Sequence, residues 1–226
     1  TSTIELQIRG TIPGSGYDQL VVGNQGLAST VQLGSSDLRL TFDAAAQPAT
    51  EYVLVRNDGT GAVAGAFATM FSTTGTLLAS PRVLLEGSLV SQDFGGSGRP
   101  AYITYAGGDG NDVAIVTAGD VTIRANNVTL IQRNGSNLEI RTGNDLPSAQ
   151  TATPTIRPIA AINDYQLNII GSPLTQSLFV DLNRFVDSAP GAIQYTGDIV
   201  FSGGGSADND TVTLFDLNTA TDDAPA

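Results

Sequence analysis

Short stretches of alternating apolar and polar residues recur along the whole chain, separated by glycine, asparagine and proline. Residues 3–9 place Ile4, Leu6 and Ile8 between polar neighbours, and residues 38–42 alternate in the same way. A period of two is typical of a strand that buries one face. Further strands are predicted at 20–22, 27–33, 52–55, 63–67, 83–85, 102–105 and 113–116. Many short strands with frequent turn residues predict a sandwich, a barrel or a β-solenoid.

The second half of the chain continues the strands at a different spacing. Its predicted strands are 121–123, 128–130, 138–140, 166–170, 177–182, 198–201 and 211–215, with asparagine-rich corners at 126–127, 134–135 and Asn144. Asparagine tolerates left-handed backbone angles, so such corners are typical of the coils of a parallel β-helix. The predicted fold class is therefore all-β, a β-solenoid (parallel β-helix-like) and/or a β-sandwich of many short strands, with little helix.

Two segments depart from the strand pattern. Leu174, Leu178 and Leu182 have helical spacing, although the alternation within 177–182 favours a strand there. The segment 146–158 carries three prolines among small polar residues, which predicts a loop-rich connection. The expected organisation is a β-rich module at 1–118, which ends in the motif GGDGNDV, and a second β-rich module with β-helix-like coils at 119–226.

The side-chain inventory argues against an enzyme. The chain contains no lysine, histidine or cysteine, and all ten of its basic side chains are arginine. Enzymes commonly take their proton carriers and activated nucleophiles from the three missing residue types. The net charge of −12 disfavours a nucleic-acid partner, because phosphate repels an acidic surface. No apolar run approaches the roughly 20 residues that span a bilayer, so membrane insertion is not expected.

Two acidic, glycine-rich segments are candidate cation sites. In Gly-Gly-Asp-Gly-Asn-Asp at 107–112, the small glycines permit a tight turn, while Asp109, Asn111 and Asp112 offer the oxygen ligands that Ca²⁺ prefers. The segment resembles the calcium-binding nonapeptide of repeat-in-toxin proteins, but it occurs once and has Ala114 where that pattern has a large apolar residue. Asp208 and Asp210 follow a run of glycines and form the second candidate. Turn formation alone also explains these residue types.

Two further kinds of site remain open. Asp181 with Asp187, or Glu139 with Asp145, are pairs of the type that hydrolyses glycosides, although any acidic surface offers such pairs. A polysaccharide lyase is a second enzymatic alternative, in which arginine serves as the base. Tyrosines could instead stack on sugar rings in a carbohydrate-binding or adhesive module, and the candidates are Tyr17, Tyr102, Tyr105, Tyr165 and Tyr195. The absence of tryptophan weakens that alternative.

Three motifs follow one another in the first half of the chain. They are the sequence GYDQLVV at 16–22, the sequence YVLVRNDGTG at 52–61 with VAGAF at 63–67, and the sequence YITYAGGDGNDV at 102–113. In this order they resemble a module of autotransporter-type β-helical passengers and of the giant secreted β-helical proteins of planctomycete-like bacteria. The sequences GSNLEI at 135–140 and DIVFSGGG at 198–205 resemble the repetitive coils of the same proteins. Two insertions, at 72–82 and 93–99, depart from the pattern.

The resemblance implies a secreted, surface-exposed and non-catalytic β-solenoid. Together with the residue inventory, it predicts a structural protein of the bacterial cell surface or extracellular space. An envelope layer (S-layer), a filament or an adhesin stalk would fit, with self-assembly or neighbouring modules of a larger polypeptide as partners. Calcium is the one expected cofactor, and glycans are the alternative ligand. The open terminal coils of a solenoid favour stacking on a neighbour, because they leave backbone groups unpaired.

Overall fold

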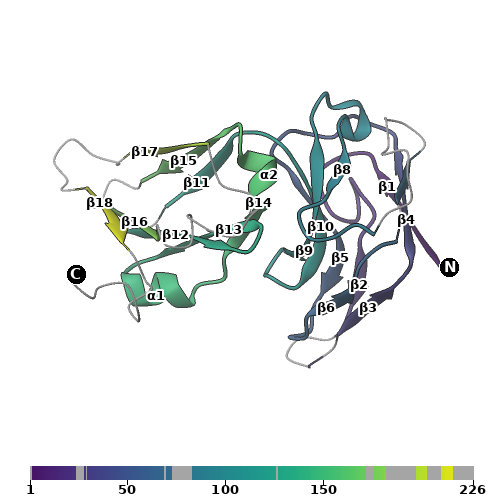
Figure 1. Cartoon of the computed structure of the whole chain (residues 1–226), viewed down its shortest axis with the longest axis horizontal. Helices are drawn as coiled ribbons and strands as arrows, with labels where there is room; N and C mark the ends of the chain where they lie inside the picture. Colours follow the sequence, from purple (N-terminus) through teal and green to yellow (C-terminus); the bar gives the residue numbers. More distant parts are fainter. Residues whose placement is uncertain are drawn as a thin grey trace, which may run out of the picture. The chain divides into compact units, whose positions relative to one another are not determined.

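The strands predicted from the alternation at 3–9 and 38–42 are present in the structure. The computed structural model describes residues 2–23, 28, 30–68, 70–72, 83–125, 127–171, 176–181, 197–202 and 210–215. It is nearly all β, with 52% strand and 8% helix, and its stacked parallel strands form a β-solenoid of about five turns. The predicted all-β class and solenoid are therefore confirmed. The chain divides into two units, Thr1–Gly119 with Ile156–Ala161, and Asp120–Thr155 with Ile162–Ala226 (Figure 1).

The first unit is built of parallel coils with three sides. The first coil contains β1 (Thr3–Ile8), β2 (Leu20–Val22) and β3 (Val31–Gly34); the second contains β4 (Asp37–Phe42), β5 (Glu51–Asn57) and β6 (Val63–Gly65). Each strand of the first coil pairs in parallel with its counterpart in the second, and β7 (Met70–Ser72) pairs in parallel with β4. This stacking puts Ile4 beside Leu38 and Leu6 beside Leu40. Alternate apolar residues of successive coils therefore meet inside the solenoid.

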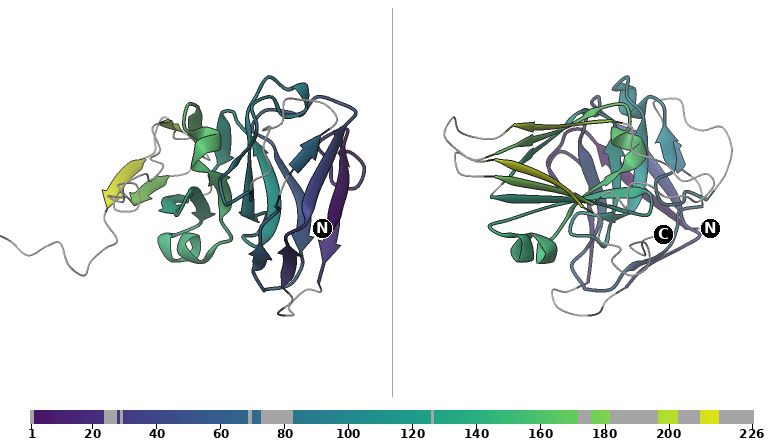
Figure 2. Two further views of the ribbon diagram at one scale, coloured as in Figure 1. Left: turned by 45° about the vertical axis from the view of Figure 1, so that its right-hand side comes forward. Right: turned by 60° about the vertical axis from the view of Figure 1, so that its left-hand side comes forward.

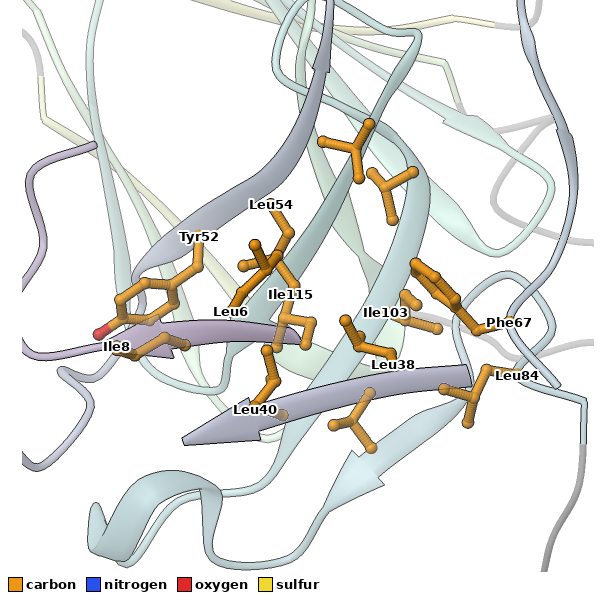
Figure 3. Packing of buried hydrophobic residues seen from close by; sticks show 14 of the residues in the cluster. Leu6, Ile8, Leu38, Leu40, Tyr52, Leu54, Phe67, Leu84, Ile103 and Ile115 are labelled. Atoms are coloured by element: carbon orange, nitrogen blue, oxygen red, sulfur yellow. The ribbon is translucent and has the colours of Figure 1, made fainter. Parts of the chain in front are cut away.

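An antiparallel segment extends one side of this unit. The strands β8 (Leu89–Ser91), β9 (Ala101–Gly107) and β10 (Asp112–Thr117) continue the sheet in the order β2-β5-β10-β9-β8, and the short 3-10 helix η1 (Phe94–Gly96) lies between β8 and β9. All residues of β10 are buried, and β10 is a central strand with β5 on one side and β9 on the other. Figure 3 shows the core that results, in which Leu38, Leu40, Leu54, Ile103 and Ile115 are fully buried.

The second unit repeats the parallel stacking with two strands in each coil. Its coils are β11 (Val121–Arg124) with β12 (Val128–Asn134), β15 (Gln166–Ile170) with β16 (Ser177–Asp181), and β17 (Asp198–Ser202) with β18 (Thr211–Phe215). The strands β11, β15 and β17 form one parallel sheet, and β12, β16 and β18 stack in the same way in another. The side-by-side strands are visible in Figure 2.

Two sequence-based expectations need correction here, and a third is confirmed. Asn134 and Gly135 do not form a coil corner. They begin the tight turn of an antiparallel hairpin between β12 and β13 (Asn137–Gly143), in which Gly135 has a φ of 60°. Residues 83–85 are not a strand: Leu84 is buried, while Val83 and Leu85 are 54% and 64% exposed. The preferred strand at 177–182 is confirmed as β16, although residue 182 lies outside the described residues.

The loop predicted at 146–158 is largely regular structure. It contains the helix α1 (Leu146–Thr151) and the strand β14 (Thr155–Pro158), and the helix α2 (Ile159–Ile162) follows. Asp145 caps α1 by accepting the Ser148 backbone N–H at 2.8 Å, while the Asp145 N–H donates to the Ser148 hydroxyl at 3.1 Å. Pro147 lies in the first turn of α1, where backbone N–H groups have no partner within the helix, so the N–H that proline lacks is not missed. Pro147 therefore marks the start of a helix rather than a loop.

Candidate functional site

The sequence-predicted acidic turn joins β9 to β10 and lies beside the loop that follows β5. Asn57 ends β5, and its side chain accepts the Gly59 N–H at 3.1 Å and donates to the Gly61 carbonyl at 2.6 Å. Asn111, in the β9–β10 turn, donates its side-chain amide to the Gly59 carbonyl at 2.7 Å. The Asn57 side chain therefore closes its own turn, and the Asn111 side chain fastens the two turns to each other. We call the residues of 57–61 and 107–112 the paired turns.

Asp112 is the buried carboxylate of the paired turns. Its side chain is 4% exposed, and its Oδ1 accepts the Asn57 backbone N–H at 2.7 Å. Burial raises the pKa of Asp112 from 3.8 to about 6, against the lowering effect of this hydrogen bond, and the charges of Asp109 and Glu51 raise it further. Arg56 has the opposite, weaker influence on the same pKa. Asp112 therefore changes charge in a mildly acidic range, in which an ordinary aspartate stays ionised.

The glycines of the motif make room for two carboxylates. A Cβ on Gly108, whose φ is +58°, would lie 1.8 Å from the Asp112 Oδ2. A Cβ on Gly107 would lie 2.9 Å from the Glu51 Oε1 and 2.6 Å from the Ala114 Cβ. Glycine is therefore required at 108 both by the backbone conformation and by the space that Asp112 fills.

Glu51 is the second carboxylate at this turn, and it was not predicted from the sequence. Its Oε1 accepts the Gly108 backbone N–H at 2.8 Å, and its Oε2 accepts from the Arg157 guanidinium at 2.6 Å. Both side chains are largely buried, at 17% and 13% exposure. Nothing in the local sequence signals this pair, because residues 51 and 157 are far apart along the chain and only the fold brings them together.

The calcium ligands predicted at this turn are only partly brought together. Asp109 is exposed, Asp112 points to the Asn57 N–H, and the amide of Asn111 donates to loop carbonyls. The buried Oδ1 of Asn111 has no hydrogen-bond partner within the described residues, which is the one feature here that favours a cation. Among all the residues that the structure describes, no group of three or more acidic side chains is placed to hold a metal ion.

The second predicted calcium site falls mostly outside the described residues. Asp208 is among the residues that the structure does not describe. Asp210 is described, and its Oδ1 accepts the Gln176 backbone N–H at 2.9 Å. This hydrogen bond joins the segment before β18 to the segment before β16, so Asp210 has a structural role in aligning successive coils.

The candidate carboxylate pairs have structural partners where they are described. Glu139 is 6% exposed and accepts from Gln132, Asn134 and Arg141 at 2.7, 2.8 and 3.0 Å. The hydrogen bonds from Asn134, Gln132 and Arg141 lower the pKa of Glu139, although desolvation, the largest single influence, opposes them. Asp145 caps α1. For the other pair, Asp187 and the side chain of Asp181 lie outside what the structure describes.

Two of the tyrosines expected at the surface belong to the core instead. Tyr17 is 2% exposed and packs edge-on against Tyr52 with 5.5 Å between ring centroids. Tyr105 packs on the same core; its hydroxyl donates to the Leu84 carbonyl at 2.6 Å and accepts the Phe67 N–H at 3.1 Å. Tyr102 and Tyr165 are partly exposed, and Tyr195 lies outside the described residues. The prediction of solvent-facing rings was therefore wrong for Tyr17 and Tyr105, whose apolar neighbours come from distant segments.

Comparison with protein-family models, with curated proteins and with solved structures found no match to this chain. Across the described residues, no helix has the length and apolar character needed to cross a bilayer.

Proposed function

We propose that this chain is a structural module of the bacterial cell surface or extracellular space, which associates with a neighbour through the end of its coil stack. An envelope layer, a filament and an adhesin stalk are the assemblies that such a module serves. The cell-surface location rests on the residue inventory and on the resemblance to large secreted β-helical proteins. The association rests on the last described coil, which consists of β17 and β18.

The observation that carries the proposal is a fall in burial along the second unit. In the middle coil, Leu167 and Ile169 are 0% exposed and Leu178 is 2% exposed. Their register partners in the last described coil are Ile199, Phe201 and Val212. Ile199 and Phe201 are only partly buried, and Val212 is 55% exposed. The inward positions of the middle coil are covered by the next coil, whereas those of the last coil have no following strand among the described residues.

Such an edge favours association for two physical reasons. Burying apolar area contributes about 25 cal/mol per Å², and a further strand would cover the exposed part of these side chains. The strand edge also presents backbone N–H and C=O groups that a neighbouring strand can pair. A structural role agrees as well with the partners of the described carboxylates, which cap a helix, align coils and fasten turns.

Calcium remains a proposed stabiliser at Asp109, Asn111 and Asp112, and at Asp208 and Asp210. The support is the residue types and the partnerless Oδ1 of Asn111. Thermal unfolding and light scattering with and without a chelator test this part. A chelator should lower the melting temperature and the particle size, and if neither changes, calcium is removed from the proposal.

The test of the function is the state of association. Sedimentation velocity over a wide concentration range, with negative-stain electron microscopy of the same samples, should show dimers or larger ordered particles. A chain that stays monomeric at every concentration would contradict the proposal. A glycan array run in parallel measures the alternative, and saturable binding of one glycan class by such a monomer would favour a carbohydrate-binding module instead.

A further inference from the structure

The outer edge of the last described coil is defined by its hydrogen bonds. The Gly171 N–H donates to the Ser202 carbonyl at 2.8 Å, so the backbone groups of Ser202 face β15. Those of Ile199 and Phe201 face the opposite way, because strand residues alternate in direction. On β18, the Thr211 N–H donates to Gln176 at 2.9 Å, so the groups of Val212 and Leu214 face outward. No described strand pairs with these outward groups.

The edge of the first coil is different, because the chain itself crosses it. The Asp43 N–H donates to the Ile8 carbonyl, so the backbone groups of Gln7 and Arg9 face away from β4. These groups are occupied: the Gln7 N–H donates to the Asp18 carboxylate at 3.0 Å, and the Arg9 N–H donates to the Gly16 carbonyl at 2.8 Å. The Asp18 N–H in turn donates to the Gln7 carbonyl at 2.8 Å. The edge of the first coil is therefore closed to a second chain at Gln7 and Arg9.

The two edges also differ in the coil that they belong to. The first coil has three strands, β1, β2 and β3, whereas the last described coil has two. Stacking the last coil of one copy on the first coil of another would therefore mismatch the sides. Stacking two last coils on each other would match every strand with its own copy. The segments 203–209 and 216–226 contain Leu217 as their one large apolar residue.

Pairing of like strands across a two-fold axis is antiparallel, and its register suits these sequences. When β17 pairs with its copy about Val200, Asp198 lies opposite Ser202 rather than opposite the second Asp198. When β18 pairs with its copy about Thr213, Val212 lies opposite Leu214. Both outward-facing residues of β18 then form hydrogen-bonded pairs, and Thr213 forms a non-hydrogen-bonded pair with itself, with about 4.5 Å between Cα atoms.

We infer that the last described coil is a self-docking edge, through which two copies of this chain pair β17 with β17 and β18 with β18 in a closed two-fold dimer. This inference rests on the proposed function and narrows it to one partner and one geometry. An isologous contact closes after two copies, so this edge gives a dimer, and the envelope layer, filament or stalk of the proposed function needs a further contact between dimers. The net charge of −12 opposes the approach of two copies, and added salt should therefore strengthen the dimer.

A matched pair of proline substitutions tests which edge is used. Val212→Pro removes an outward N–H from the last coil at a side chain that is 55% exposed. Val21→Pro does the same on the first coil: Val21 is 48% exposed, and its neighbour Val22 accepts the Asp58 N–H, so the groups of Val21 face outward. Circular dichroism and thermal unfolding check that both variants fold. Sedimentation should show a dimer for the wild type and for Val21→Pro, and a monomer for Val212→Pro.

A single cysteine substitution tests the register of the dimer without depending on proline. The chain has no cysteine, so Thr213→Cys introduces a single thiol. A Cα separation of about 4.5 Å lies at the short end of the disulfide range, so mild oxidation should cross-link Thr213→Cys into a covalent dimer. Val21→Cys is the control on the other edge and should stay uncross-linked.

The remaining outcomes overturn the inference in different ways. Open chains that both proline variants disrupt would show head-to-tail stacking, which refutes the two-fold dimer but keeps the proposed assembly function. A monomeric wild type that dimerises only after removal of 216–226 would identify the chain's own tail as the occupant. A wild type that stays monomeric with and without that tail would refute the inference and the assembly function together.

Discussion

Replacing Gly108 by alanine is the sharpest test of how the paired turns are built. Gly108 has a φ of +58°, and an added Cβ would lie 1.8 Å from the Asp112 Oδ2. The substitution therefore has two costs. An L-residue in the left-handed region loses about 1–2 kcal/mol. Displacing the buried Asp112 carboxylate also breaks its bond to the Asn57 N–H, which costs about 1–3 kcal/mol more.

A second glycine separates these two costs. Gly34 has nearly the same backbone angle, φ +61°, but an added Cβ there meets nothing within 4 Å. Gly34→Ala should therefore lose only the conformational part, about 1–2 kcal/mol, whereas Gly108→Ala should lose about 2–5 kcal/mol. Urea unfolding followed by circular dichroism measures both losses on the same scale.

The double variant completes the thermodynamic cycle. In an Asp112→Ala background the carboxylate is absent, so Gly108→Ala should lose only the conformational part there. The difference between the two backgrounds is the interaction between residue 108 and residue 112. Equal losses for Gly108→Ala and Gly34→Ala in the wild-type background would refute the reasoning. The space for Asp112 would then not be the reason for glycine.

Three further predictions follow from side chains whose environment is described. Burial raises the pKa of Asp112 to about 6 in the folded state, so the folded protein binds the proton of this carboxyl more tightly than the unfolded chain does. The stability that this proton contributes is therefore present below about pH 4 and is lost as the pH rises to 6. Asp112→Asn should remove this loss, so its stability relative to wild type should rise by about 1–3 kcal/mol between pH 4 and pH 6 and level off above; parallel urea curves at four pH values measure it. Tyr105→Phe should cost about 1–3 kcal/mol in thermal unfolding, because the Phe67 N–H and the Leu84 carbonyl lose their shared partner, and a melting temperature equal to wild type would contradict this role. Asp145→Ala should lower the urea midpoint through loss of the α1 cap, while Asp145→Asn should retain most of the stability. Equal losses for the two variants would mean that the charge of Asp145, and not the cap, matters.

The sequence by itself determined the strands and the class of fold. Alternation at Ile4, Leu6 and Ile8 is a local property, since each side chain's face is fixed by the pleat, and the structure confirms β1 there. The same holds for the strands at 38–42, 166–170 and 198–201, which appear as β4, β15 and β17. The turn at 107–112 was also predicted from the sequence, because glycine and asparagine permit tight backbone bends.

Only the tertiary structure decided what those strands pair with and which side chains they bury. The spacing of the second half predicted a coil corner at Asn134–Gly135, but the residues there form an antiparallel hairpin. Tyr17 and Tyr105 look like surface residues in their own segments, yet both pack on apolar side chains from distant strands. The contact of Glu51 with Arg157, and the fit of Asp112 against Gly108, join residues that no sequence period relates. Periodicity fixes which face of a strand is apolar, whereas strand pairing and carboxylate placement depend on long-range packing, which local sequence does not encode.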